Sequence, residues 1–151
     1  MITIEEFKKK YTDKVRFLGL DLGSKRIGVS ICDERQSIAT PFKTIEKTNT
    51  NALIEELKII IQENVIKGII VGNPINMDGS LGRSAQSVND VATNIAKSIN
   101  IPVILWDERL STVGAFNLSS QLDINVSKRV KSIDQNAAAF ILQGAIDYLN
   151  N

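Results

Sequence analysis

The sequence contains no histidine and only one cysteine, Cys32. It therefore cannot form a disulfide within the chain, a zinc site built from Cys and His ligands, or a Ser-His or Cys-His catalytic pair. These absences exclude most hydrolase mechanisms. The groups that remain for hydrolytic chemistry are carboxylates, hydroxyls, lysine or arginine, and hard cations held by oxygen ligands, chiefly magnesium or manganese.

The sequence also has no run of about eighteen apolar residues that could cross a bilayer. Its N-terminus lacks the basic and then apolar order of a signal peptide. We therefore expect a cytoplasmic protein that does not associate with membranes. A length of 151 residues with 43% hydrophobic residues is typical of one compact domain, so we expect a single domain over 1–151, with 1–14 as an N-terminal helical appendage.

An excess of positive charge is missing as well, because the formal net charge is only +1. The chain as a whole therefore has no general electrostatic attraction to nucleic acid. Any such contact must come from local basic patches, although short basic clusters are more often ordinary solvated surface. The candidate nucleic-acid-binding residues are Lys25, Arg26, Arg83, Arg109, Lys128, Arg129 and Lys131.

The first third of the chain has the pattern of one short helix and three strands. Thr3 and Glu6 form a capping-box pattern, which predicts a helix to about Tyr11. Strands are predicted over 17–21, 26–32 and 39–45, the first two as a hairpin. Pro41 places the third strand at a sheet edge.

The remainder alternates between amphipathic and uniformly apolar segments. Helices are predicted over about 53–65, 88–99, 112–122 and from Ser132 onward, with a loop over 123–131. The apolar runs 69–71 and 102–106 are typical of buried parallel strands. Because crossovers of this kind are right-handed, both should run parallel to the first strand. The expected fold is an α/β domain with a five-stranded mixed sheet, made of an antiparallel meander and two parallel strands, and helices on both faces.

Three acids fall where such folds place their active sites, at the carboxyl ends of parallel strands. Asp21 ends the first strand, Glu108 follows the strand at 102–106, and Asp134 lies in the predicted first turn of the last helix. Carboxylates that converge could hold a cation, and a cation can activate water for attack on a phosphodiester.

Each acid also has a simpler interpretation. Asp134 could merely favour a helix N-terminus. Glu108 could form a salt bridge, and the sequence alone does not distinguish it from Asp107. Asp21 is harder to explain as structural, because a carboxylate between Leu20 and Leu22 at an apolar strand end requires a partner or a cation.

Four motifs together resemble a known family. They are LGLDLGSKRIGV over 18–29, VGNPINMDGS over 71–80, DERLST over 107–112 and IDQNAA over 133–138. In this order and spacing they are similar to the YqgF family, also called RuvX, of pre-16S rRNA nucleases or Holliday junction resolvases. The resemblance runs from about Arg16 to the C-terminus. One departure is Asn73, which stands where leucine is commoner.

The resemblance implies an RNase H-like fold in which Asp21, Glu108 and Asp134 are the catalytic acids and the ligands of Mg²⁺ or Mn²⁺. It further implies a metal-dependent nuclease that matures the 5′ end of the 16S rRNA precursor. Resolution of branched DNA is the older inference for such proteins. The implied partners are nucleic acid, as pre-rRNA or branched DNA, and ribosomal precursor particles. We expect a monomer or a weak homodimer.

Two alternatives remain open. The segment 19–24 is also similar to the first phosphate loop of actin-like ATPases and sugar kinases, although those enzymes close two such domains around a nucleotide and this chain has the length of one. A non-catalytic RNA-binding assembly factor with the same fold is the second alternative, since the near-neutral charge is compatible with weak, partner-assisted binding.

Overall fold

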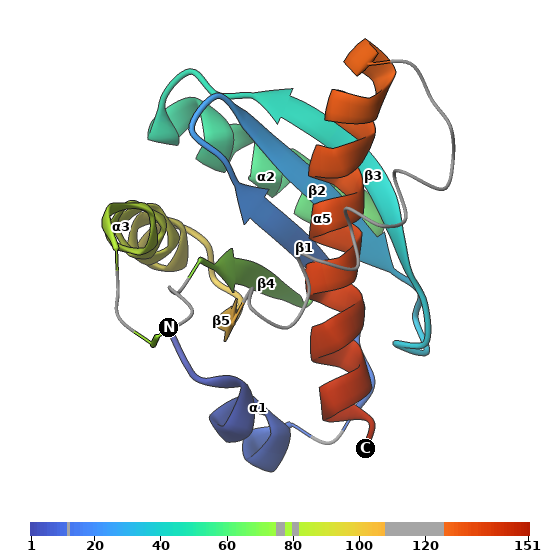
Figure 1. Cartoon of the computed structure of the whole chain (residues 1–151). Helices are drawn as coiled ribbons and strands as arrows, with labels where there is room; N and C mark the ends of the chain where they lie inside the picture. The colour runs from blue at the N-terminus through green and yellow to red at the C-terminus, as the bar shows by residue number, and fades with distance from the viewer. Residues whose placement is uncertain (12, 75–77, 80–81, 108–125) are drawn as a thin grey trace.

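The computed structural model describes residues 1–11, 13–74, 78–79, 82–107 and 126–151, and within 126–135 it describes the backbone alone. Five strands form one sheet in the order β3-β2-β1-β4-β5 (Figure 1). The elements in chain order are α1 (Ile4–Lys10), β1 (Phe17–Leu22), β2 (Arg26–Cys32), β3 (Ala39–Glu46), α2 (Thr50–Asn64), β4 (Gly68–Asn73), α3 (Arg83–Ser98), β5 (Val103–Asp107) and α5 (Val126–Leu149).

The strand pairing confirms the predicted mixed sheet. β1 pairs antiparallel with β2, and β2 pairs antiparallel with β3, which gives the expected meander. β4 runs parallel to β1, and β5 runs parallel to β4. Pro41 lies in β3, at the edge of the sheet, where a residue without an N–H interrupts no central ladder. The carboxyl ends of β1, β4 and β5 therefore meet at one end of the sheet.

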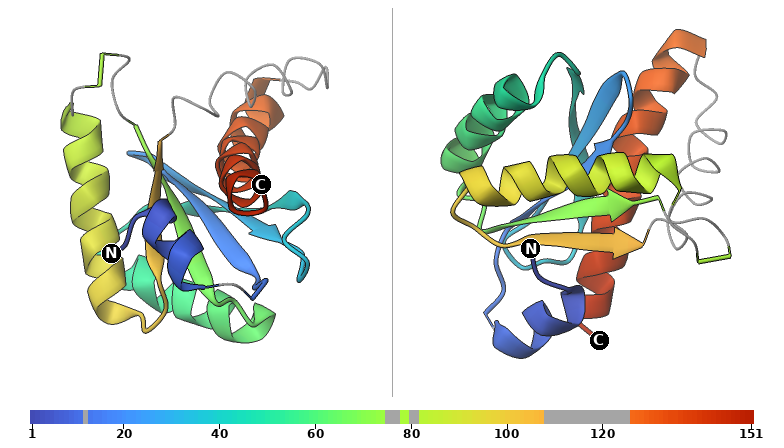
Figure 2. Two further views of the ribbon diagram at one scale, coloured as in Figure 1. Left: turned by 90° about the horizontal axis from the view of Figure 1, so that it is seen from below. Right: turned by 90° about the vertical axis from the view of Figure 1, so that its left-hand side faces the viewer.

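Helices cover both faces of the sheet, and alternate residues of each strand pack on opposite sides (Figure 2). In β1, Leu18 and Leu20 join the apolar core beneath α2 and α3. Phe17 joins the second core, to which α1 and α5 contribute. This alternation lets the face of any residue near the end of a strand be assigned from its neighbours.

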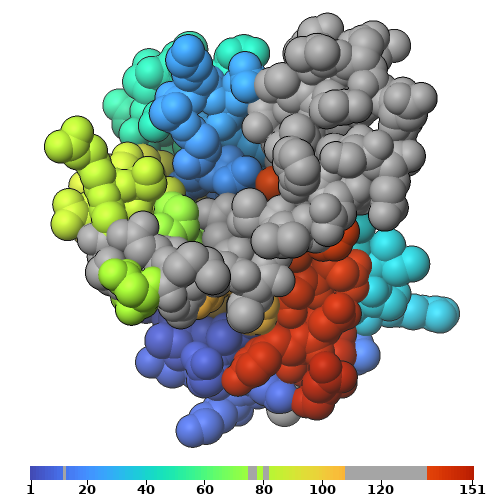
Figure 3. Space-filling model, in the orientation of Figure 1, coloured from blue at the N-terminus to red at the C-terminus, as the bar shows by residue number. Residues whose placement is uncertain are grey.

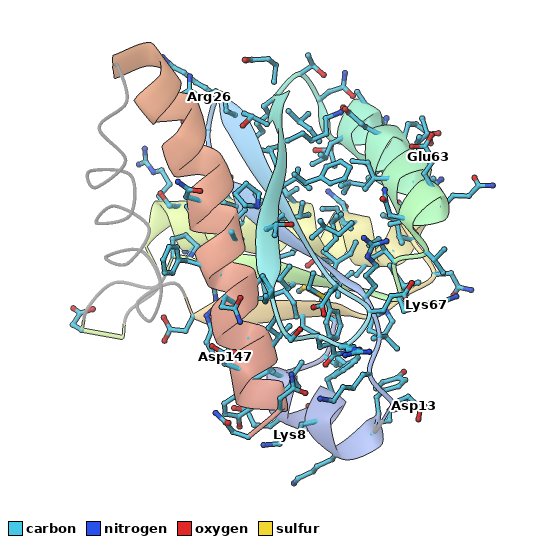
Figure 4. All side chains as sticks on the ribbon, turned by 90° about the vertical axis from the view of Figure 1, so that its right-hand side faces the viewer. Lys8, Asp13, Arg26, Glu63, Lys67 and Asp147 are labelled. Atoms are coloured by element: carbon cyan, nitrogen blue, oxygen red, sulfur yellow. The ribbon has the colours of Figure 1, made fainter. Side chains whose placement is uncertain are left out.

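The N-terminal helix packs against the second core. Thr3 caps α1 as the sequence predicts, because its Oγ1 accepts a hydrogen bond of 3.1 Å from the Glu6 N–H. Phe7 is buried against Phe17, with ring centroids 5.2 Å apart. Lys8, labelled in Figure 4, donates a hydrogen bond of 3.3 Å from Nζ to the carbonyl oxygen of Tyr148 at the end of α5. A basic side chain at the C-terminal end of a helix interacts favourably with the partial negative charge there.

The last helix begins earlier than the sequence predicted. α5 starts at Val126, so the predicted loop over 123–131 is wrong for 126–131, and Ser132 lies inside the helix rather than at its start. Asp134 is consequently not in the first turn. The error arose because the basic residues hid an apolar stripe, at 126, 130, 133 and 137, that continues the helical period. The helix predicted over 112–122 lies outside the described residues.

None of the helices in the described ranges is both long enough and apolar enough to cross a lipid bilayer.

Candidate active site

Asp21 lies at the carboxyl end of β1, on the face of the sheet that α5 covers. It pairs in register with Gly28 of β2 and is half-buried. Because side chains alternate along a strand, Asp21 shares its face with Phe17 and Gly19. Gly19 sits directly against α5, where an added Cβ would lie 2.8 Å from the Leu142 Cβ.

The turn that follows Asp21 is tight and requires a glycine. The Gly23 N–H donates a hydrogen bond of 3.1 Å to the carbonyl oxygen of Asp21. A Cβ on Gly23 would clash with the carbonyl oxygen of Arg26, across the turn. Gly23 therefore permits the close approach of the Arg26 backbone beside the end of β1.

Two hydrogen bonds fix how α5 lies on the sheet. The Ser30 hydroxyl donates a hydrogen bond of 2.7 Å to the carbonyl oxygen of Ala138, and the Ala39 N–H donates one of 2.8 Å to Oε1 of Gln143. Ala39 pairs with Cys32, so Gln143 lies near Cys32 while Ala138 lies near Ser30. Going back along α5 from Gln143 to Ala138 therefore corresponds to going back along β2 from Cys32 to Ser30. The start of α5 therefore points toward the end of the sheet that carries Asp21 (Figure 1).

The acid at the end of β5 faces the other way. Asp107 pairs in register with Asn73 of β4 and alternates with Val103 and Leu105, which pack beneath α2 and α3. Asp107 and Asp21 therefore lie on opposite faces of the sheet. The register thus distinguishes Asp107 from Asp21 by the face of the sheet on which each lies.

The other predicted site residues are described in part or lie outside the description. Glu108 and Arg109 fall outside the described residues. The backbones of Lys128, Arg129, Lys131 and Asp134 belong to α5. Among the side chains that the structure does describe, no three of His, Cys, Asp or Glu gather at one point that could hold a metal ion. Asp21 is thus the member of the predicted acidic set whose side chain the structure places.

Three of the predicted basic residues are described with their side chains, and they lie around the same end of the sheet. Lys25 is exposed in the β1–β2 turn, Arg26 begins β2, and Arg83 is the first residue of α3. Figure 4 labels Arg26 at the end of the molecule where α5 begins. Arg26 is not isolated, since it interacts with another residue.

Sequence reasoning missed Lys47. Its N–H donates a hydrogen bond of 3.0 Å to the carbonyl oxygen of Lys25, which places it beside the β1–β2 turn, and it lines a cleft together with Arg83. The available signal was the strand pairing itself. Because Arg26 pairs with Glu46 in antiparallel strands, Lys47 lies opposite Lys25, the last residue of the β1–β2 turn.

Cys32 has a structural environment. It is 1% exposed, and its Sγ accepts a hydrogen bond of 3.1 Å from the Phe17 N–H. Burial raises the pKa of the thiol. A buried thiol with a raised pKa is a poor nucleophile, so Cys32 contributes no reactive group to this site.

Comparisons with known proteins match this chain to one family. The family model described as "RuvX: Holliday junction resolvase" matches residues 15–148. A relative from Pelagibacter ubique, named "Putative pre-16S rRNA nuclease", is 86% identical over 151 residues and covers 100% of both chains. A relative from Sphingopyxis alaskensis with the same name is 45% identical over 132 residues, which are 87% of this chain and 86% of that protein.

Among solved structures, RuvC of Thermus thermophilus in complex with a Holliday junction substrate is similar in fold. The TM-score is 0.59 at 9% sequence identity, and the match covers 91% of this chain and 97% of that one. This likeness establishes the predicted RNase H-like fold. On the evidence of the family model and of these relatives, the chain belongs to the RuvX family.

Proposed function

We propose that this chain is a metal-dependent nuclease that hydrolyses phosphodiester bonds of nucleic acid and processes the 5′ end of pre-16S rRNA. Asp21, Glu108 and Asp134 are the proposed catalytic acids. Family membership supports the nuclease class, and the name of the relative that is 86% identical supports the pre-rRNA substrate. The observation that carries the proposal is the position of Asp21. It lies on the sheet face covered by α5, at the same end of the sheet as the N-terminal end of α5.

The course of α5 supports the inclusion of Asp134. Position 134 precedes Ala138 by one helical turn, about 6 Å, on the same side of the helix. Asp21 lies two residues beyond Gly19, about 7 Å along β1, on the strand face that contacts Ala138. Both acids are therefore displaced from this contact in the same direction. The start of α5 at Val126 argues against the simpler interpretation of Asp134 as a helix-start residue.

The choice of Glu108 rests on strand alternation. Asp107 occupies the face opposite Asp21. The α5 side of β5 carries Ile104 and Trp106 instead, which pack in the core shared with α5. We therefore assign the role of third acid to Glu108 rather than to Asp107.

Carboxylates suit the proposed cation. Mg²⁺ and Mn²⁺ prefer oxygen ligands, and the chain offers no histidine that would favour zinc. A cation bound by these acids would supply an activated water and would balance negative charge on the phosphate oxygens. The acids would orient that water and the phosphate, with Asp21 acting from the end of β1 and Asp134 from α5.

A cleavage assay tests this proposal. The purified protein is incubated with a 5′-extended pre-16S rRNA fragment in Mn²⁺, in Mg²⁺ and in EDTA. Asp21→Asn and Glu108→Gln should abolish cleavage without lowering the thermal midpoint by more than a few degrees, because both substitutions keep the side-chain shape. Asp107→Asn and the exposed Asp90→Asn on α3 should cleave at close to the wild-type rate. Full activity of Asp21→Asn would overturn the proposal.

A second candidate function is resolution of branched DNA, which the description of the matching family model favours. The same assay with a four-way DNA junction separates the two. Cleavage of the rRNA precursor at a defined site, with the junction left intact, supports the pre-rRNA function. Symmetric cleavage of the junction with no cleavage of the precursor would assign the chain to DNA recombination instead.

A further inference from the structure

A basic cleft lies on the other side of the β1 end from Asp21. It has a volume of about 270 Å³ and is bordered by the β1–β2 turn, by Lys47 after β3, and by the first turns of α3. In Figure 3 the turn and the start of α3 reach the surface next to each other. Its lining is apolar at Leu22, Val88 and Val91 and is otherwise formed by Gly23, Ser24, Lys47, Arg83, Ser84 and Ser87.

No acidic side chain in the described ranges neutralises the two cations of the cleft. Lys47 and Arg83 come from separate elements, and neither side chain forms an ion pair or a hydrogen bond in the part of the chain that the structure describes. Among the described residues, the cleft lining includes no aspartate or glutamate. Two exposed, unpaired positive charges at one concave surface attract an anion and raise its local concentration.

Hydrogen-bond donors accompany the charges. Ser24, Ser84 and Ser87 bring hydroxyl groups to the cleft. The first hydrogen bond of α3 runs from the Gln86 N–H to the carbonyl oxygen of Gly82, and none of the side chains that the structure describes caps the helix. The backbone N–H groups of the first turn thus add to the two cations and the hydroxyls, a combination that matches the oxygen atoms of a phosphate.

The position of the cleft relates it to the proposed catalytic acids. Leu22 lines the cleft and directly follows Asp21, while the two side chains point to opposite faces of the sheet. A nucleic-acid strand that crosses the end of β1 would therefore meet the catalytic acids on one side and the cleft on the other.

We propose that this cleft binds a backbone phosphate of the substrate strand, at a nucleotide beside the bond that is cut. The proposal deepens the proposed nuclease function and rests on it. Lys47 and Arg83 supply the charge, and Ser84 with the first turn of α3 supplies the donors. Such contacts recognise phosphate and not base, so the cleft positions the strand without reading its sequence.

The test measures binding in EDTA, where cleavage plays no part. The probe is a short fluorescein-labelled single-stranded RNA, followed by fluorescence anisotropy at several salt concentrations. The variant combines Lys47→Gln with Arg83→Gln. The control combines Lys9→Gln on α1 with Lys97→Gln at the end of α3, which removes the same charge from exposed positions outside the cleft.

The cleft variant should bind more weakly than the control, and the slope of log K against log salt should fall by about 0.7 for each phosphate that the protein no longer neutralises. In ¹⁵N-labelled wild-type protein, the amide signals of Ser84 and Ser87 should shift as the RNA is added. Equal affinity and slope in the two variants, or unshifted Ser84 and Ser87 signals, would overturn the cleft as a binding site.

The two proposals can fail separately. If the wild type cleaves RNA while the Lys47→Gln, Arg83→Gln variant binds as the control does, the cleft proposal fails and the nuclease proposal stands. If binding depends on the cleft as expected but no cleavage occurs with either cation, the nuclease proposal fails and the cleft remains a phosphate-binding site.

Discussion

The Ser30 hydroxyl donates a buried hydrogen bond of 2.7 Å to the carbonyl oxygen of Ala138 and so joins the middle of β2 to α5. The contact is close because Gly19, opposite Ser30 in register, has no side chain. A Cβ on Gly19 would clash with the Ser30 Oγ and lie 3.0 Å from the carbonyl oxygen of Ala138. The lack of a side chain at Gly19 therefore allows α5 to lie this close to the sheet.

Gly19→Ala should destabilise the protein by about 1–3 kcal/mol, the usual effect of overpacking a well-packed core. The added methyl group has to displace α5 or the centre of β2. If Asp134 acts together with Asp21 as proposed, the displacement should also lower the cleavage rate at temperatures where the protein stays folded. Urea denaturation and the cleavage assay measure the two effects, and an unchanged free energy of unfolding would contradict the packing argument.

A double-mutant cycle checks that the Ser30 hydroxyl is the group in conflict. Ser30→Ala alone should cost about 1 kcal/mol because the hydrogen bond to Ala138 is removed. The loss in free energy of unfolding of the Gly19→Ala, Ser30→Ala double variant should be smaller than the sum of the two single losses, by about 0.5–3 kcal/mol. The reason is that the clash with the hydroxyl is absent in the double variant. Additive effects would place the strain at Leu142 or Ala138 instead.

The β2–β3 turn should make stability depend on pH. The N–H of Ile38 and the Ser37 hydroxyl and N–H donate hydrogen bonds to the Asp33 carboxylate, and these hold its pKa well below its usual range. A carboxylate whose pKa is lowered on folding stabilises the fold above its unfolded pKa of about 3.9, and this stabilisation is lost as the pH falls through the folded pKa.

Asp33→Asn should therefore lower the free energy of unfolding by a constant amount above about pH 5, and the difference from wild type should shrink below about pH 4. Chemical denaturation at a series of pH values measures this difference. Asparagine removes the charge, keeps one acceptor oxygen for the two backbone N–H groups and replaces the oxygen that accepts from the Ser37 hydroxyl with an amide NH₂ group. A difference that is the same at pH 3 and pH 7 would show that the charge of Asp33 does not stabilise the turn.

Much of the fold could be predicted because local signals and topology rules agreed. The hairpin around Gly23, the edge position of Pro41 and the parallel course of the apolar runs all follow from patterns within a few residues. The start of α5 could not be predicted in this way. Its apolar residues are separated by Lys128, Arg129 and Lys131, which are good helix formers that also suit a basic loop.

The site required contacts between distant parts of the chain. Ser30 and Ala138 are 108 residues apart in sequence, and no local pattern indicates that they touch. Lys47 lies at the cleft because β3 pairs with β2, and Asp107 lies on the face opposite Asp21 because β5 pairs with β4 in a particular register. The residue types and their order predicted Asp21 as a candidate. The sheet faces on which Asp21 and Asp107 lie could be read only from the strand register.

Asn73 should be replaceable at a gain in stability. It is 9% exposed, and its Oδ1 has no hydrogen-bond partner among the described residues. It alternates in β4 with Ile69 and Val71, which belong to the apolar core beneath α2 and α3. Asn73→Leu should raise the free energy of unfolding by about 1–3 kcal/mol, because a buried acceptor without a partner is removed.

Asn136 provides the matched control for that change. It is also buried, at 6% exposed, but it does interact with another residue. Asn136→Leu should therefore lower stability where Asn73→Leu raises it, and thermal denaturation of both variants compares them. A loss of stability in Asn73→Leu would contradict the argument. A gain in stability together with weaker cleavage would indicate that the Asn73 Oδ1 contacts the substrate.

The N-terminal helix should contribute strongly to stability through one aromatic side chain. Phe7 is 3% exposed, lies 5.2 Å from Phe17 between ring centroids and stacks on Tyr11 at 4.6 Å. Phe7→Ala should cost about 3–5 kcal/mol, since it leaves a cavity against the core of the sheet. Tyr11→Ala is the control, because Tyr11 is 40% exposed and should cost clearly less. Urea denaturation measures both, and a Phe7→Ala effect no larger than that of Tyr11→Ala would show that α1 adds little to the core.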